Sequence, residues 1–495
     1  MANWLDKAIE VISPKRGFER ARYRAAIDVV RTYEGAKAGR GTDNWLTTGT
    51  SANAVIAPAL HKLRDRSRDL VRNNPHAKKA INTLVARSIG TGIQAKTKLI
   101  EWKQWCKECD FDGQLTFEAL QAQIARCVFE SGECLIRFRY RKLNEGFAIP
   151  LQIQVLEPDF LDTNKNGLLS NGNYVIAGIE VNSSGQREAY WLYDQHPGDA
   201  LGYTLLQWQS KRVLAQDIIH VYEKERPGQL RGVPRLAVSI IKIRYYDEFD
   251  EAELVRKKIE ACFTAFISSD DDVQAIGPVK PDSVDKQKRI ETVEPGMFVY
   301  GRANESITFG APNAVQGYPE YSSVQLHAIA AGVGVTYEAM TGDLTGVNFS
   351  SIRTGTHEFR ALIESFQWLT FIPMVCDKIA AKVADVALIS GVAKKRKPVE
   401  VWTTPKWPWT DPLKDVQAEA LAIATPLKSL SESIRESGYD PDEVFAEIAA
   451  EREKLKKFGI NLTLSAAKNE KPTETDNKEE TAKEDSNEED STTTE

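Results

Sequence analysis

A pair of helical segments flanking a compact insertion constrains the fold most strongly. Residues 236–266 show a long, charged helical pattern that would span about 45 Å as one helix. Short strand and turn patterns follow over residues 268–312, and a second helix is predicted over residues 319–334. The chain has 495 residues, which is more than a single hydrophobic core usually covers. We therefore expect two or more subdomains, with a change of character at Pro234.

Before Pro234, helical and strand patterns alternate. Helices are predicted over residues 56–71, 75–89 and 117–129, and an Asn at the break before Pro75 can cap the second of them. Alternating or apolar runs predict the strands, which are residues 133–140, 151–156, 174–181, 189–193 and 218–222. Residues 54–235 are therefore predicted to form an α+β domain.

The C-terminal part is mainly helical. Residues 351–390 predict a helix of about 60 Å that Pro373 should kink. Two more helices are expected over residues 412–430 and 441–458. Residues 465–495 hold almost no large apolar side chain, so we predict that they are disordered.

The N-terminal residues differ from the rest. Residues 36–51 are small, polar and rich in glycine, which predicts a flexible arm. Residues 1–16 carry apolar side chains at helical spacing and lack the continuous apolar run of a signal peptide. A helix packed on protein is the expected structure, and a helix on a membrane surface is the alternative.

The net charge of −6 is unevenly distributed. Residues 468–495 contain 11 acidic residues and 4 lysines, a balance of −7 that leaves about +1 for the rest. This charge distribution does not indicate a globally basic nucleic-acid binder. No stretch is long and apolar enough to span a bilayer, so we expect no membrane partner.

Motifs for catalysis and cofactor binding are missing from the sequence. It contains no G-x-x-x-x-G-K-[ST], no H-E-x-x-H and no G-x-S-x-G. Cys106 and Cys109 form a C-x-x-C, but Cys127 and Cys134 do not supply the second close pair of a zinc site. We predict no catalytic, cofactor-binding or metal-binding residues, and buried thiols that act as small apolar groups. The basic run at residues 394–397 either contacts phosphate or complements the end of the preceding helix.

Several short motifs occur in a fixed order along the chain. They are RSRDLVRNNP at 66–75, EPD at 157–159, IHVY, RPGQ and RGVP within 219–234, EPG at 294–296, TYEAMTGD and NFSS within 336–353, and WTDPLK at 409–414. In order and spacing they resemble the lambda-type branch of the phage portal family. Phe349 and Met340 stand where that family more often has Tyr and Leu.

The resemblance implies a fold and its subdivision. The fold is α+β, a portal-type ring subunit with an α+β wing, a two-helix stem, a small clip insertion and a mainly helical C-terminal part. The expected regions are an N-terminal helix and arm (1–53), wing (54–235), first stem helix (236–267), clip (268–318), second stem helix (319–341), tunnel loop (342–350), kinked helix and crown (351–464) and acidic tail (465–495).

The resemblance also implies a function. The chain would be a portal vertex subunit that forms a dodecameric ring for genome packaging and ejection. Its partners would be double-stranded DNA passing without sequence specificity, and terminase, capsid and head-completion proteins. It would be assembled in the host bacterial cytoplasm and end in the virion. The expected DNA-channel loop residues are Asp343, Thr345, Asn348, Ser350, Ser351 and Arg353, and the expected acidic channel lining of the stem is Asp247, Glu248, Asp250, Glu251 and Glu253.

Two other classes remain as alternatives. A packaging enzyme, such as a terminase or nuclease, would need a P-loop or a metal-binding acidic triad, and the P-loop is missing. Another head structural protein, such as a capsid or connector subunit, is the second alternative. The helix–insertion–helix pattern favours a ring with a stem.

Overall fold

The computed structural model describes residues 49–199, 209–261, 265–268, 306–309, 317–346, 348–408 and 411–460. The chain divides into two compact units, Met1–Thr410 and Asp411–Glu495. The predicted N-terminal helix, nearly all of the arm, most of the 268–312 insertion and the acidic tail lie outside the described residues. Among the helices that are described, none is long and apolar enough to cross a membrane.

Three predicted helices of the first unit are confirmed: α3 (Ala52–Asn73), α4 (Pro75–Ser88) and α6 (Phe117–Ser131). Asn74 caps α4 through a 2.8 Å bond from the Ala77 N–H to its side-chain oxygen. Gly132 ends α6 with a φ of +90°. Gly132 and Gly232 approach closely, since a Cβ on Gly232 would lie 2.1 Å from the Gly132 carbonyl oxygen. A side chain at either position would clash, so the close approach of the two segments requires glycine at both.

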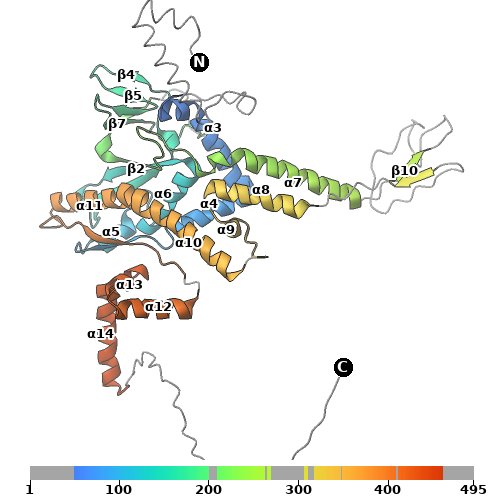
Figure 1. Cartoon of the computed structure of the whole chain (residues 1–495). Coiled ribbons are helices and arrows are strands. Elements are labelled where there is room, and N and C mark those ends of the chain that lie inside the picture. Colours follow the sequence, from blue (N-terminus) through green and yellow to red (C-terminus); the bar gives the residue numbers. More distant parts are fainter. Residues whose placement is uncertain are drawn as a thin grey trace, which may run out of the picture. The chain divides into compact units, whose positions relative to one another are not determined.

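The strands form two main antiparallel sheets (Figure 1). The three-stranded sheet has the order β3 (Leu151–Leu156), β2 (Glu133–Tyr140), β9 (Ile218–Tyr222), and all three strands have their predicted bounds. The five-stranded sheet follows chain order, with β4 (Gly167–Leu168), β5 (Tyr174–Ile176), β6 (Ile179–Val181), β7 (Arg187–Leu192) and β8 (Lys211–Leu214).

The sheets also correct the sequence analysis. The single strand predicted over 174–181 is wrong, because Ala177 and Gly178 adopt positive φ angles of 47° and 82° and turn the chain between β5 and β6. A short strand, β1 (Gln94–Thr97), pairs with β12 (Val399–Thr403), and neither strand was predicted. Local periodicity cannot show a pairing between segments about 300 residues apart.

The main hydrophobic core lies in the first unit. It is formed by α4, α6, one face of β2, and aromatic residues of α5 (Trp102–Glu108), of which Trp105 is fully buried. Cys106, Cys109 and Cys134 are buried in it with free thiols, as predicted. Burial raises the pKa of the Cys106 and Cys109 thiols, so they stay neutral and act as apolar groups.

The long charged helix is shorter than predicted. Residues 235–238 form a 3-10 helix, α7 covers Ile240–Ala261, and residues 265–268 belong to a strand, β10 (Ala265–Ser268). β10 pairs with β11 (Ser306–Phe309), and this long-range ladder takes the backbone groups that a longer helix would have used. The second helix of the pair, α8 (Tyr318–Val333), is confirmed. Figure 1 shows α7 and α8 extending side by side from the sheets.

The helix predicted over 351–390 consists of three parts. They are α10 (Phe349–Phe366), a π-helical segment (Gln367–Cys376) and α11 (Asp377–Ile389). Pro373 lies inside the π-helical segment. Proline has no N–H and its ring crowds the carbonyl four residues earlier, so the wider helix accommodates it.

The second unit contains α12 (Pro412–Ala424), α13 (Leu430–Glu436) and α14 (Pro441–Lys457). The single helix predicted over 412–430 is wrong, because α12 ends at Ala424 and Thr425 is extended. Thr425 precedes Pro426, and a residue before proline avoids the helical conformation. The prediction of the last helix is confirmed by α14.

Candidate functional site

The predicted loop lies between α9 (Tyr337–Thr341) and α10, and its first half is held by one carboxylate. Asp343 Oδ1 accepts hydrogen bonds from the Thr345 N–H at 2.8 Å and the Thr345 hydroxyl at 2.6 Å. The Tyr337 hydroxyl donates to Asp343 Oδ2 at 3.2 Å. Through these bonds, Thr345 above all keeps the pKa of Asp343 below its usual range. Gly342, with a φ of 80°, ends α9 just before this turn.

The second half of the loop caps the next helix. The side chain of Asn348 accepts a hydrogen bond from the Ser351 N–H at 2.8 Å, and the Ser351 hydroxyl donates to the Asn348 carbonyl at 3.0 Å. Ser350 lies in the first turn of α10, and Arg353 follows there with an exposed side chain. The structure thus gives Asn348 and Ser351 a capping role and leaves Thr345 exposed.

The five acidic residues of α7 that were predicted to line the channel do not share one environment. Asn74 donates to Asp247 Oδ1 at 2.6 Å, and the Tyr318 hydroxyl of α8 donates to Asp250. Glu253 is only 7% exposed and forms an ion pair with Arg256 at 2.5 Å. Glu248 pairs with Arg244 on the exposed surface at 2.9 Å, and Glu251 is also exposed. Among these five, the exposed acids are Asp247, Glu248, Asp250 and Glu251, two of which are already hydrogen-bonded to other elements.

A buried ion network joins several of the sequence motifs. Its centre is the fully buried Glu133 at the start of β2. Arg64 Nη2 of α3 donates to Glu133 Oε1 at 2.9 Å, and Arg231 Nε lies 3.0 Å from both carboxylate oxygens. Burial alone would raise the pKa of Glu133, but the Arg231 guanidinium and the hydrogen bond from His220 hold it well below its usual range. The carboxylate is therefore ionised and fully paired.

His220 completes the contacts of this carboxylate as a neutral side chain. Its Nε2 lies 3.0 Å from Glu133 Oε2, and the Gly232 N–H donates to the same oxygen at 3.0 Å. Burial lowers the pKa of His220 to about 4. Neutral His220 thus donates from Nε2 to the carboxylate.

The network reaches the surface through Asp159 and Arg68. Arg64 Nη1 lies 3.1 Å from Asp159 Oδ1, and Arg68 Nη2 lies 2.7 Å from Asp159 Oδ2. Arg68 also pairs with Glu157 at 2.9 Å. The sequence analysis missed Arg64 and Glu133 as members of this cluster. An acidic residue directly before the apolar β2 run was the signal that could have found Glu133.

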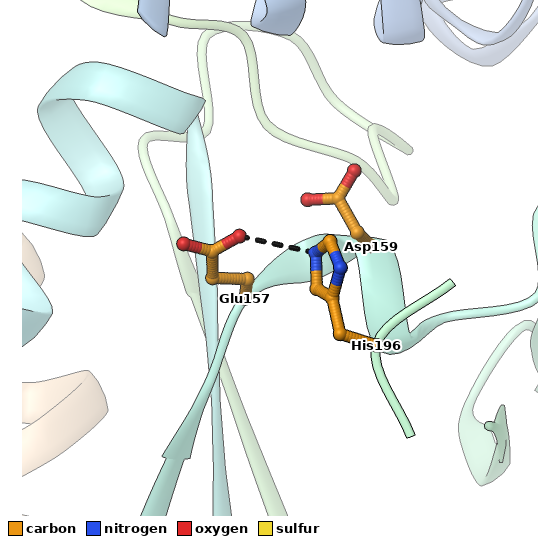
Figure 2. A group of neighbouring side chains, drawn as sticks. All are labelled: Glu157, Asp159 and His196. Carbon is orange, nitrogen blue, oxygen red and sulfur yellow. Dashed lines mark ion pairs between the residues drawn. The ribbon is translucent and has the colours of Figure 1, made fainter. Parts of the chain in front are cut away.

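Figure 2 shows a further group, formed by Glu157, Asp159 and His196, whose side chains are potential metal ligands and lie close together. His196 Nε2 lies 3.3 Å from Glu157 Oε2, and His196 Nδ1 accepts a hydrogen bond from the Gly198 N–H at 3.0 Å. In the neutral ring Nε2 therefore carries the hydrogen and has no lone pair for a metal. Because the Arg68 guanidinium already bridges the two carboxylates, this group is an ion-pair cluster.

Comparison with known proteins identifies the family. Residues 38–367 match the family model described as phage portal protein, lambda family. The chain belongs to this family. It is 28% identical to the probable portal protein of Halomonas phage phiHAP-1 over 474 residues, covering 87% of this chain and 88% of the relative. It is 22% identical to portal protein B of Escherichia phage lambda, covering 88% and 92% of the two chains.

Solved structures show weaker similarity. The neck of a native gene transfer agent particle contains a chain with 12% identity and a TM-score of 0.44, covering 76% of this chain and 94% of that one. An HK97 family phage portal protein from Corynebacterium diphtheriae has 11% identity and a TM-score of 0.33, with coverage of 75% and 99%. These scores are too low to carry an argument, so the α+β assignment depends on the elements described above.

The chain is thus a portal vertex subunit of a tailed phage or prophage, a structural protein of the family. Membership gives no support to the packaging-enzyme alternative. Several residues of the sequence motifs have physical roles in the structure. The buried network includes residues from four of the motifs, namely Arg68, Asp159, His220 and Arg231. Gly232 donates its N–H to Glu133 and also forms the close contact with Gly132. Tyr337, Asp343 and Asn348 shape the loop.

Proposed function

We propose that twelve copies of this chain form a ring around a channel, and that double-stranded DNA passes through it during packaging and ejection. The observation that carries the proposal is the position of the loop 342–348. It is exposed at Leu344 and Thr345, and it follows α8 after the single short helix α9. The stacked rings of His327 in α8 and Tyr337 in α9, 4.1 Å apart, fix one end of the loop to the α7–α8 pair.

The α7–α8 pair is well suited to be the stem of such a ring. Tyr246 and Ser322 hydroxyls lie 2.6 Å apart, and the Phe249 ring contacts Tyr318 and Tyr321. These contacts join the middle of α7 to the first turns of α8. In this proposal residues 54–235 are the wing, 268–318 the clip, and 351–464 the kinked helix and crown; the structural boundary at Thr410 falls within the last region.

The charge distribution supports sliding of DNA through the channel. Tight phosphate binding would hold the duplex, because each neutralised phosphate adds counterion-release affinity. Apart from the acidic segment the chain has a charge of about +1, and Glu248 and Glu251 leave carboxylates exposed on α7. Terminase, capsid and head-completion proteins are the proposed docking partners of the assembled ring. We expect no ATPase or nuclease activity, assembly in the host cytoplasm and a final position in the virion.

The test compares one bulky substitution at two exposed sites. Thr345→Trp places an indole on the loop, and Ser183→Trp places the same group in the β6–β7 turn. Both variants should form rings visible in negative-stain images. Thr345→Trp should block the production of DNA-filled heads, whereas Ser183→Trp should not. Normal filling with Thr345→Trp would contradict the channel position of the loop, and a monodisperse monomer for the unmodified chain would contradict the ring.

A further inference from the structure

The side of α7 that faces away from the core carries a row of mainly apolar residues. Ile243 and Tyr246 are buried, whereas Ile241 and Tyr245 on the other side of the helix are 47% and 65% exposed. Exposed side chains recur there at intervals of three and four residues, which is the spacing of a helix face that packs against another helix. We call this face the outer row of α7, and it consists of Ile241, Tyr245, Glu248, Ala252 and Val255.

The neighbouring helix α8 has an outer row of the same kind. Tyr321 and Val324 are 47% and 64% exposed, and Glu320 is the only Asp, Glu, Lys or Arg among the 16 residues of the helix. A helix face in water usually carries charged side chains, so this face resembles a surface that is covered in an assembly. The outer row of α8, again spaced by three and four, consists of Tyr321, Val324, Ala328 and Ala331.

Within one copy, α7 and α8 run antiparallel in a fixed register (Figure 1). The Ser239 hydroxyl, directly before α7, donates to the Ile329 carbonyl at 3.3 Å, and the Tyr246 and Ser322 hydroxyls lie 2.6 Å apart. The residue numbers of both pairs add to 568. A residue of α7 therefore lies level with the α8 residue whose number completes this sum.

A ring would keep this register between neighbouring copies. Rotation about an axis that runs along the two helices moves each residue around the ring and leaves its height unchanged. The outer row of α7 in one copy and the outer row of α8 in the next would then meet within one residue of that register, or about 1.5 Å, because their members pair at a sum of 569. The pairs are Ile241 with Ala328, Tyr245 with Val324, and Glu248 with Tyr321.

We propose that the outer row of α7 packs against the outer row of α8 in the next copy of this chain, an inference that rests on the ring of the proposed function. A ring joins two different surfaces of each copy, and copies related by rotation require the two surfaces to share one register, as these rows do. The large Ile241 side chain lies opposite the small Ala328, and the Tyr321 hydroxyl lies opposite the Glu248 carboxylate. The contact repeats between copies the antiparallel pairing that α7 and α8 form within one copy.

The first experiment tests the register by disulfide cross-linking. Under mild oxidation, Ile241→Cys/Ala328→Cys should give a ladder of linked oligomers on a non-reducing gel, because a disulfide forms only where two Cα atoms come within about 7 Å. Ile241→Cys/Tyr321→Cys moves the second thiol along α8 by about 10 Å and should give at least tenfold less of the linked oligomers. Both variants keep the six native cysteines and therefore share one background.

The cross-linking result is read together with negative-stain images of the same samples. Rings without a ladder, or equal ladders from the two double variants, would overturn the inference and leave the ring of the proposed function intact. A monodisperse monomer from the unmodified chain would overturn the ring and the inference with it.

The second experiment places one charge at two equally exposed apolar sites. Val324 in the outer row of α8 and Leu168 in β4 are both 64% exposed. Val324→Glu would bury a carboxylate against Tyr245 of the next copy and should lower the fraction of chain in rings at least tenfold at micromolar concentration. Leu168→Glu should leave that fraction unchanged. Sedimentation velocity measures the fraction, and far-UV circular dichroism checks that both variants are folded. Rings at the unmodified level from Val324→Glu would overturn the inference and assign this face to another partner.

Discussion

The buried network around Glu133 and the loop between α9 and α10 both consist of polar residues from sequence motifs, yet they are built differently. Glu133 is reached by Arg64, His220 and Arg231 from three distant parts of the chain, and all are buried. In the loop, Asp343 and Asn348 bond mainly to residues two or three positions away. The buried carboxylate has hydrogen-bond partners that are far from it in the sequence. The side chains of the exposed loop form their hydrogen bonds with residues close to them in the sequence. We therefore expect substitutions in the buried network to change the stability of the fold more than substitutions in the loop.

The largest expected effect is that of Glu133→Gln. It removes the carboxylate between two buried guanidinium groups, and such a loss typically costs about 3–5 kcal/mol. Chemical denaturation at fixed subunit concentration measures the free energy of unfolding. Glu251→Gln makes the same chemical change at an exposed site and should shift stability by less than about 0.5 kcal/mol. Equal effects of the two substitutions would show that the network does not determine stability.

The next largest effect is a pH dependence of the free energy of unfolding that is caused by His220. Its pKa is lowered by burial from 6.5 to about 4 in the folded chain. Between these values the unfolded chain binds a proton that the folded chain does not, so stability is fully present above pH 6.5 and falls as the pH decreases toward 4. Denaturation curves at pH 7 and pH 5 measure this difference. His220→Gln should reduce it, and an unchanged pH slope in that variant would assign the effect to other groups.

A smaller effect is expected in the loop. Asn348→Ala removes the cap of α10 and should cost about 1 kcal/mol of stability. Asn348→Asp keeps an oxygen that can accept a hydrogen bond from the Ser351 N–H, so its melting temperature should be close to that of the unmodified chain. Thermal melting of both variants, measured on assembled rings, separates the capping role from a role at the channel. A loss as large as that of Glu133→Gln would contradict the local character of the loop.

The smallest effect is expected from deleting residues 468–495. The segment has no large apolar residue with which to build a core, so ring formation and the melting temperature should be nearly unchanged. Negative-stain images and thermal melting of the shortened chain test this expectation. A shortened chain that fails to fold would show that the segment contributes to the core, unlike either region compared above.

The sequence predicted the parts of the fold that local chemistry decides. Asn74 with Pro75 and Gly132 mark the ends of α4 and α6, and β2, β3 and β9 have the predicted bounds. The pairing of β1 with β12 was missed, because it joins segments that only the tertiary fold brings together. Glu133 was missed for the same reason, since its partners Arg64, His220 and Arg231 lie 69 to 98 positions away. A loop was predicted over residues 342–350 from its glycines and from residues able to cap the next helix, and in the structure α10 begins two residues earlier than predicted, at Phe349.

The β1–β12 pairing has a consequence for the order of events during synthesis. Ala95 pairs with Trp402, and the Trp402 indole donates to Asp377 at 2.7 Å and meets Trp102 edge-on. At about 5 to 20 residues per second, the ribosome needs roughly 15 to 60 s to reach Trp402 after Ala95 has been made. During that interval β1 has no partner strand and Trp102 lacks one of its aromatic neighbours. The β1–β12 pairing and the packing around Trp102 can therefore form only after β12 has been synthesised.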